Sequence, residues 1–325
     1  MSAAGETGPV WISDAEVAAA LTPRLAYKAV SDALAAHANN LCVQPLKPYV
    51  RPGGRENEYE RGRHIAMPCY VGGEVNAVGI KWISSVPKNL ERGLPRASGV
   101  VVLNDVETGR PLAIMDCATL SARRTGAVAA ICWNHFGLPG EILGLVGCGP
   151  INREVAIAID ALGTRPSEIR IFDVAEDRSE QFRRELGQHI DTRLTVAPSV
   201  RGCIDGAAAI VAATGSKSYI DPEWLEACRL MVPISLDDFR RETLLGADKI
   251  VVDDFEGCAR EEKLFHRVVR DGHLARDRIY AELGQVVVGA KAGRTGDERV
   301  FANLMGMAVE DIAVAKVVYD RVVSR

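Results

Sequence analysis

The stretch of residues 141–173 constrains the fold more than any other part of the chain. It begins with an apolar run, 142–146, that has the length of a buried strand, and Gly147 and Gly149 follow at once. Apolar side chains then recur at helical spacing, and a second short apolar run ends at Asp173. Strand, glycine turn, helix and strand in this order predict a βαβ unit, and therefore an α/β fold with a Rossmann dinucleotide-binding domain.

The glycine turn indicates where a dinucleotide would bind. Gly147 permits a tight turn, and Gly149 allows a pyrophosphate to approach the backbone at the N-terminus of the next helix, where free N–H groups and the helix dipole favour anions. We therefore predict cofactor contacts at both glycines and at the first helical residues, Pro150 and Ile151. The third glycine of the usual fingerprint is missing, and Asn152 stands in its place.

Asp173 distinguishes between the two nicotinamide dinucleotides. It follows the second strand, where a carboxylate can accept hydrogen bonds from ribose hydroxyls. The same negative charge would repel a 2′-phosphate, so the sequence favours NAD over NADP.

Composition and charge exclude several other classes of protein. A chain of 325 residues is long enough for two domains, and 47% hydrophobic and 25% charged residues are typical of a globular protein. The net charge of −4, without a basic run, gives no indication of nucleic-acid binding. No apolar run approaches the roughly 20 residues that span a bilayer, and residues 1–9 lack a signal core, so we expect a cytoplasmic protein without membrane contact.

The cysteines and histidines show no metal-ligand pattern. The eight cysteines are scattered without a Cys-x-x-Cys pair, and the six histidines include no pair at helical spacing. In a cytoplasmic enzyme we expect such cysteines to be reduced and buried, and we expect no metal site.

The region before the glycine turn has a different pattern. Four strands are predicted there without intervening helices, at 64–70, 76–84, 97–104 and 111–115. They indicate an antiparallel or mixed sheet, distinct from the α/β region that follows. An alanine-rich helix is predicted at 116–136, a strand at 299–304, and a helix at 306–323 whose apolar positions are expected to pack on the first domain.

Five passages resemble the ornithine cyclodeaminase/mu-crystallin family, and together they extend over nearly the whole chain. They are Met67-Pro68, Gly79-Ile80-Lys81, Ala122-Arg123-Arg124-Thr125, Gly147-Cys148-Gly149 and the run from Asn303 to Asp311. The resemblance implies a substrate-binding and dimerisation domain built from residues 1–136 and 300–325, with the Rossmann domain inserted at 137–299. It also implies a homodimer.

A narrower resemblance is to one branch of this family, which acts on N-(2-amino-2-carboxyethyl)-L-glutamate and releases 2,3-diaminopropionate and 2-oxoglutarate with NAD. The passages that carry it are Val43–Tyr49, Gly79–Ile83, Gly93–Ser98, Ile234–Leu236 and Val252–Asp254. The resemblance leaves open the natural substrate within the family, and whether the product enters a siderophore or a peptide antibiotic.

The family resemblance implies that cations hold the substrate carboxylate, and the matching residues are Lys47, Lys81 and Arg124. Lys47 stands where the cyclodeaminases carry arginine, so a bidentate contact is lost. Lys81, which we also predict to be catalytic, lies in an apolar strand. It needs an anionic partner if it is buried, and the alternative is a strand-edge lysine with its ammonium group in solvent. Arg96, in a glycine-proline loop, is either a further anion contact or a surface arginine.

The resemblance places the catalytic aspartate just after the strand that ends near Leu236, where Asp237 and Asp238 compete. The narrower branch has the pattern Leu-x-Asp here, which favours Asp238, and the neighbour would then cap the next turn. Thr214, after another strand, matches a cofactor contact of the family.

Ile65 distinguishes between the activities in the family. The cyclodeaminases carry a glutamate at this position, near the amines of their substrate, whereas a substrate with three carboxylates needs cations. The alternatives that stay open are an ornithine cyclodeaminase, which forms proline and ammonia, and a dehydrogenase of alanine or cyclic imines. A protein of another class, an NADPH-gated small-molecule carrier like mu-crystallin, is also open.

Overall fold

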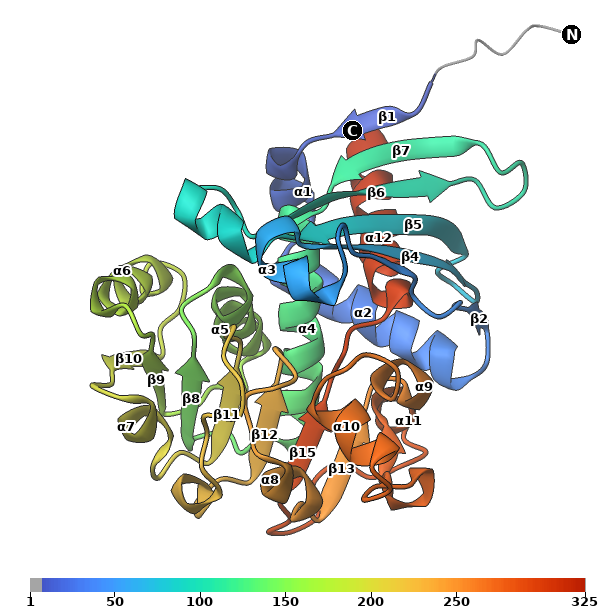
Figure 1. Ribbon diagram of the computed structural model, residues 1–325. Helices are drawn as coiled ribbons and strands as arrows, with labels where there is room; N and C mark the ends of the chain where they lie inside the picture. The colour runs from blue at the N-terminus through green and yellow to red at the C-terminus, as the bar shows by residue number, and fades with distance from the viewer. Residues whose placement is uncertain (1–7, 325) are drawn as a thin grey trace, which may run out of the picture. The chain divides into compact units, whose positions relative to one another are not determined.

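The computed structural model describes residues 8–324 and confirms the α/β class (Figure 1). The chain divides into two compact units. The first contains the chain up to Arg124 and from Met307 onward, and the second extends from Thr125 to Gly306. No helix among the described residues is long and apolar enough to cross a membrane.

These divisions differ from the sequence expectation. It put the two crossings, the points where the chain passes from one unit to the other, after residues 136 and 299. The first crossing lies within helix α4 (Ala118–Phe136), because the end of this helix bonds to the second unit: the Trp133 indole donates to the Thr164 carbonyl over 2.6 Å. The second crossing follows strand β15 (Val300–Asn303), which pairs with strands of the second unit. The strand expected at 299–304 is therefore part of the parallel sheet.

The first unit is built on a mainly antiparallel sheet. Its order is β1-β7-β6-β5-β4-β2, with β3 also paired to β4 and with β1 parallel to β7. The strands are β1 (Val10–Ile12), β2 (Cys42–Val43), β3 (Tyr49–Val50), β4 (Arg63–Val71), β5 (Ala77–Ser85), β6 (Ala97–Asn104) and β7 (Pro111–Asp116). The expected antiparallel or mixed sheet is confirmed.

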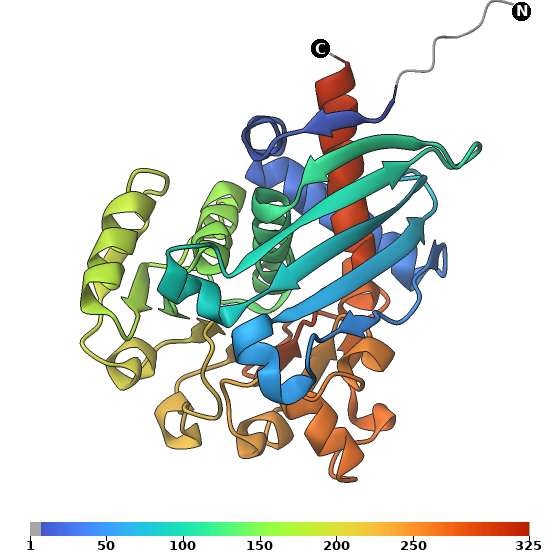
Figure 2. The ribbon, with the colours of Figure 1, turned by 45° about the horizontal axis from the view of Figure 1, so that its top comes forward.

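Helix α12 (Ala308–Val323) packs on one face of this sheet, crossing β4, β5 and β6 (Figure 2). Close approach requires a glycine in β5, because a Cβ on Gly79 would lie 3.0 Å from Ile312 of α12 and 2.3 Å from the Val102 carbonyl. Helices α1 (Asp14–Ala20) and α2 (Pro23–Ala38) also contact α12, and both begin with a side-chain cap, from Ser13 and Thr22. Short helices α3 (Glu58–Arg61), η1 (Arg55–Asn57) and η2 (Pro87–Arg92) complete the unit.

The second unit contains an eight-stranded parallel sheet in the order β10-β9-β8-β11-β12-β15-β13-β14. Its other strands are β8 (Ile142–Val146), β9 (Glu168–Phe172), β10 (Arg193–Val196), β11 (Ala209–Ala212), β12 (Leu230–Pro233), β13 (Lys249–Val252) and β14 (Ala281–Glu282). The order reverses between β8 and β11, so the carboxyl ends of these two strands form a topological switch point, where doubly wound sheets bind ligands.

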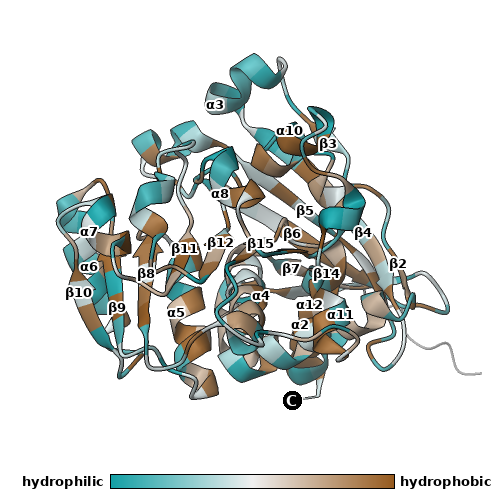
Figure 3. Ribbon diagram, turned by 90° about the horizontal axis from the view of Figure 1, so that it is seen from below, coloured by the Kyte–Doolittle hydropathy of each residue, from teal (hydrophilic) through white to brown (hydrophobic). Residues whose placement is uncertain are grey.

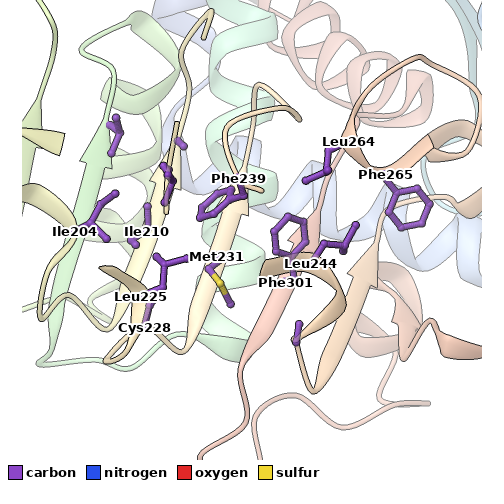
Figure 4. Close-up of a cluster of buried hydrophobic side chains, with 14 of the residues drawn as sticks. Ile204, Ile210, Leu225, Cys228, Met231, Phe239, Leu244, Leu264, Phe265 and Phe301 are labelled. Carbon is purple, nitrogen blue, oxygen red and sulfur yellow. The ribbon is translucent and has the colours of Figure 1, made fainter. Parts of the chain in front are cut away.

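The central strands of this sheet are apolar because helices cover them. Hydrophobic residues concentrate on β8, β11, β12 and β15, and hydrophilic ones on the outer sides of the helices (Figure 3). The helices are α5 (Pro150–Leu162), α6 (Glu176–Leu186), α7 (Val200–Ile204), η3 (Pro222–Leu225), α8 (Arg241–Leu245), α9 (Phe255–Cys258), α10 (Leu264–Arg270), η4 (Arg276–Arg278) and α11 (Leu283–Val287). One core cluster includes Phe239, Phe301 and Phe265, and Phe239 meets Phe301 edge-on at 5.5 Å (Figure 4).

Candidate functional site

The predicted glycine turn lies at the switch point of the second unit. Gly147 has φ +97°, and a Cβ there would lie 2.5 Å from the Ala213 carbonyl and 3.2 Å from Thr214, so only glycine fits. Gly149 is the N-cap of α5, and a Cβ there would meet nothing within 4 Å. The structure therefore brings Gly147 and Thr214 together, and leaves open space beside the first turn of α5.

Asn152 explains the missing third glycine. It is fully buried, and its amide donates to the carbonyl of Val146 over 3.0 Å and to that of Gly147 over 2.7 Å. The side chain thus fixes the end of β8 from within α5.

Asp173 lies directly after β9 and faces the glycine turn. Its carboxylate accepts from the Cys148 N–H over 2.9 Å and from the Ala175 N–H over 3.2 Å. The backbone N–H of Asp173 donates to the Ser179 hydroxyl. It is only partly buried, so its position suits a hydroxyl-rich ligand at this edge of the sheet.

Lys81 is the most deeply buried cation of the first unit. Its residue is 1% exposed, and Nζ lies 2.7 Å from the Asp311 carboxylate. The solvent-exposed alternative is therefore wrong, and the predicted anionic partner is present. Burial, with the charge of Arg124, lowers the pKa of Lys81 to about 8, although Asp311 acts in the opposite direction.

Arg124 belongs to the same cluster. Its guanidinium lies 2.9 Å from Asp311 and 3.0 Å from Glu310, and both carboxylates are fully buried at the start of α12. Two cations and two carboxylates thus share one interior, where each charge needs a partner because desolvation is costly.

Lys47 and Arg96 lie elsewhere on the sheet. Residues 46–50 alternate between exposed and partly buried, which puts Lys47 and Tyr49 on the face that carries Ile65 and Lys81. Two strand spacings separate Lys47 from β5, about 10 Å. Arg96 is an exposed residue just before β6, and its Nε donates to the Ser85 hydroxyl over 3.4 Å.

Asp238 lies at the carboxyl end of β12 with no exposed surface. Its carboxylate accepts from three hydroxyls: Ser235 at 2.7 and 2.8 Å, Thr214 at 2.9 Å, and Tyr219 at 3.1 Å. Burial raises the pKa of Asp238, and the hydroxyl donors oppose that shift. The cluster links the aspartate to Thr214 and so to the glycine turn.

Asp237 points into a different environment. It is 2% exposed, and its carboxylate lies 2.8 Å from Arg267 and 3.5 Å from Lys263. Leu236, directly before it, has φ +69°, a conformation that costs a bulky residue about 1–3 kcal/mol and that occurs mainly at functional sites.

Sequence reasoning missed two groups of residues here. Glu310 and Asp311 appeared only as part of a family-like passage, although two adjacent acids in an otherwise apolar helix are a signal that buried cations face them. Ser235 appeared only within the passage Ile234–Leu236, and the hydroxyl of Tyr219 gave no signal. Among the described residues, no group of three or more His, Cys, Asp or Glu could hold a metal.

A glycine turn at the switch point of a parallel sheet, with an acid after the second strand, defines a dinucleotide-binding unit of the Rossmann class. Residues 12–325 match the ornithine cyclodeaminase/mu-crystallin family, and the chain belongs to this family.

Relatives cover almost the whole chain. An N-((2S)-2-amino-2-carboxyethyl)-L-glutamate dehydrogenase of Staphylococcus aureus is 35% identical, over 95% of this chain and 93% of its own. The structure of an archaeal alanine dehydrogenase dimer with bound NAD is 27% identical, with a TM-score of 0.83 over 97% and 96% of the two chains. The Δ1-pyrroline-2-carboxylate reductase of Thermococcus litoralis, solved with NADH and L-proline, has the same fold, with a TM-score of 0.88 at 23% identity over 97% and 98%.

Proposed function

We propose that the protein oxidises N-(2-amino-2-carboxyethyl)-L-glutamate with NAD and releases L-2,3-diaminopropionate and 2-oxoglutarate. The observation that carries this proposal is the 35% identity, over 95% of the chain, to an enzyme of that name. The site supports it, because Lys47 and Lys81 share a sheet face with Ile65, where a glutamate would favour a diamine substrate.

NAD is the proposed cofactor. The open space at Gly149, the uncapped first turn of α5 and the neighbouring Thr214 fit a pyrophosphate, and Asp173 fits an unmodified ribose. When bound, the nicotinamide accepts the hydride from the glutamate-derived Cα–H of the substrate. Calorimetric titration with NADH and NADPH tests the choice of cofactor, and tighter binding of NADPH would contradict it.

Lys47, Lys81, Arg96 and Arg124 are the proposed carboxylate contacts. The cations orient the substrate so that one Cα–H bond is presented for oxidation. Lys81 and Arg124 act within a rigid cluster, because Asp311 already holds both side chains.

Asp238 is the proposed proton acceptor. It has no exposed surface, so a proton reaches it through a partly exposed hydroxyl that it binds, from Ser235, Thr214 or Tyr219. Its raised pKa favours this role. Loss of the amine proton and of the hydride leaves an imine, water adds to its carbon, and cleavage of the C–N bond gives the two products.

Incubation of the purified protein with NAD and the substrate tests the proposal. We expect one NADH, one 2,3-diaminopropionate and one 2-oxoglutarate per turnover, measured by absorbance and by mass spectrometry. Proline and ammonia from ornithine, without net NADH, would instead indicate a cyclodeaminase. NADH from alanine would indicate another dehydrogenase of the family, and tight NADPH binding without turnover would indicate a carrier.

We also propose a cytoplasmic homodimer. All eight cysteines are free thiols, which fits a reducing compartment. The sheet face opposite α12 carries partly exposed apolar side chains across β4, β5, β6 and β7, a surface suited to a second copy. They include Pro68, Tyr70, Ile80, Trp82, Val100, Val102 and Ile114. Ile80→Asp should give a monomer in sedimentation analysis if this face is the interface, and an unchanged mass would exclude it.

A further inference from the structure

A second group of cations lies on the sheet of the first unit, at the end where β4 begins and β5 ends. Lys81 lies in the middle of β5, four residues before that end. Arg63 begins β4, and Arg51 directly follows β3, the neighbouring strand. Arg51 Nε lies 2.9 Å from one carboxylate oxygen of Glu58, and Arg63 Nη1 lies 3.1 Å from the other. Arg51 also stacks over the Tyr49 ring at 4.6 Å.

Arg96 joins this group from the loop before β6. Its backbone carbonyl accepts from the Val86 N–H, and its guanidinium reaches Ser85, which pairs with Arg63 in the sheet register. Although Arg96 as a whole is exposed, partial desolvation of its guanidinium and the nearby charge of Arg63 lower its pKa, whereas Glu58 acts in the opposite direction. These three arginines and Glu58, called here the arginine cluster, therefore lie together where β4 begins and β5 ends.

The arginine cluster and Lys81 share one face of the sheet. Along β4 and β5 the residue pairs on that face are Met67 with Lys81, then Ile65 with Ile83, and then Arg63 with Ser85. Four residues of β5 separate Lys81 from Ser85, the partner of Arg63, which corresponds to about 13 Å of strand. The surface between them is apolar, since it consists of Ile65, Ile83 and Tyr49.

A long anion with a charge at each end matches this arrangement. In the proposed substrate, the side-chain carboxylate of the glutamate half is about 9 Å from the far carboxylate when extended. Lysine and arginine side chains reach several ångströms along the sheet, so both ends can be bound at once. Lys81 and Arg124 alone cannot supply this charge, because Asp311 and Glu310 balance them.

We propose that the arginine cluster, through Arg51 and Arg63 together with Arg96, binds the distal carboxylate of a dicarboxylate substrate and so selects it over monocarboxylate amino acids. This inference rests on the proposed function for the identity of the substrate, but it concerns only the number of carboxylates. Glu58 holds the two partly buried arginines in position, and the short loop at Gly62 (φ +73°) seats its helix against Ser85.

Binding of two matched probes to the NADH-loaded protein tests this selection. 2-Oxoglutarate and 2-oxopentanoate have the same carbon chain and differ in the distal carboxylate. We expect 2-oxoglutarate to bind at least about tenfold more tightly by calorimetry, the contribution of a charge-assisted contact. Arg63→Gln and Arg51→Gln should each weaken 2-oxoglutarate binding by about tenfold and leave 2-oxopentanoate unchanged.

Arg110→Gln is the control, because Arg110 is an exposed arginine in the turn between β6 and β7. It should leave both affinities unchanged. Equal wild-type affinities for the two probes, or an undiminished preference in both arginine variants, would overturn the inference. Each variant is first checked by its melting temperature, and the second arginine variant keeps the test decisive if one variant does not fold. The probes need no turnover, so a failure of the NADH assay is a separate result.

Discussion

Lys81 and Asp238 are both buried charges, but the protein stabilises them in different ways. Lys81 lies in the first unit among opposite charges, with Asp311 2.7 Å away and Arg124 bound to the same carboxylate. Asp238 lies in the second unit among hydroxyl groups, and no cation contact is described for it. The first arrangement fixes charges in space, whereas the second stabilises one charge with donors that can also pass on a proton.

This difference suggests a division of labour. A neutral ion cluster is rigid and expensive to break, which suits the positioning of a substrate carboxylate. A carboxylate held by Ser235, Thr214 and Tyr219 has a raised pKa and hydroxyl neighbours, which suits proton transfer.

The largest effect is expected from Asp238→Asn. An amide fills the same space but cannot accept a proton, so turnover should fall by roughly 10²–10⁴-fold, the usual contribution of a general base. NADH affinity, measured by calorimetry, should change little. The matched control is Asp237→Asn, because Asp237 binds Arg267 and Lys263 instead of hydroxyls. Loss of turnover in the control alone would reverse the assignment of the two aspartates.

Asp311→Asn should destabilise the fold strongly. It leaves Lys81 and Arg124 buried beside a neutral group, so the free energy of unfolding should fall by about 3–5 kcal/mol. Urea denaturation measures the change. Asp320→Asn on the same helix removes only a surface pair with Lys316 and should cost at most about 0.5 kcal/mol. Similar losses in the two variants would show that the buried cluster is not special.

The pH dependence of kcat/KM should report the ionisation of Lys81. Its pKa is lowered to about 8, so the ammonium form that holds a carboxylate predominates below that pH and is lost above it. We expect kcat/KM to fall about tenfold per pH unit above pH 8, because this ratio reports ionisation of the free enzyme. An ordinary lysine would keep its charge beyond pH 10. Lys81→Arg should remove this alkaline decline, and a decline that persists must come from another group.

The smallest effect is expected from Tyr219→Phe. It removes one of the hydroxyl donors of Asp238 and leaves those of Thr214 and Ser235. The loss of one such bond, about 0.5–1.5 kcal/mol, should lower turnover by only a few-fold to tenfold. Steady-state kinetics measure it. A loss as large as that of Asp238→Asn would mean that Tyr219 itself carries the proton.

The elements that depend on local sequence could be predicted. The run from Ile142 to Asp173 gave the strand, the glycine turn and the helix correctly, because glycine conformation and apolar spacing act over a few residues. The need of Lys81 for an anionic partner also followed from its apolar strand. The identity of that partner did not, because no spacing rule connects β5 to the start of α12.

Long-range pairing accounts for the other differences. β15 enters the parallel sheet between β12 and β13, which its four residues alone do not reveal. Asn152 counted against the turn in sequence, and only its two carbonyl contacts show why it is there. Around Asp238, the hydroxyl of Ser235 is local, but those of Thr214 and Tyr219 come from the loop after β11, and this long-range meeting could not be foreseen.

The ion cluster has a consequence for how the protein is synthesised. Arg124 and Glu310 are 186 residues apart, and the whole second unit lies between them. Because chains fold as they emerge from the ribosome, the second unit can fold as one continuous segment, while β5 and its lysine wait for α12. The first unit is therefore completed later, and until then its sheet lacks both the carboxylates and the apolar side chains that cover it. Apolar surface that stays exposed in this way favours aggregation of the nascent chain, so its release before α12 is complete should be costly.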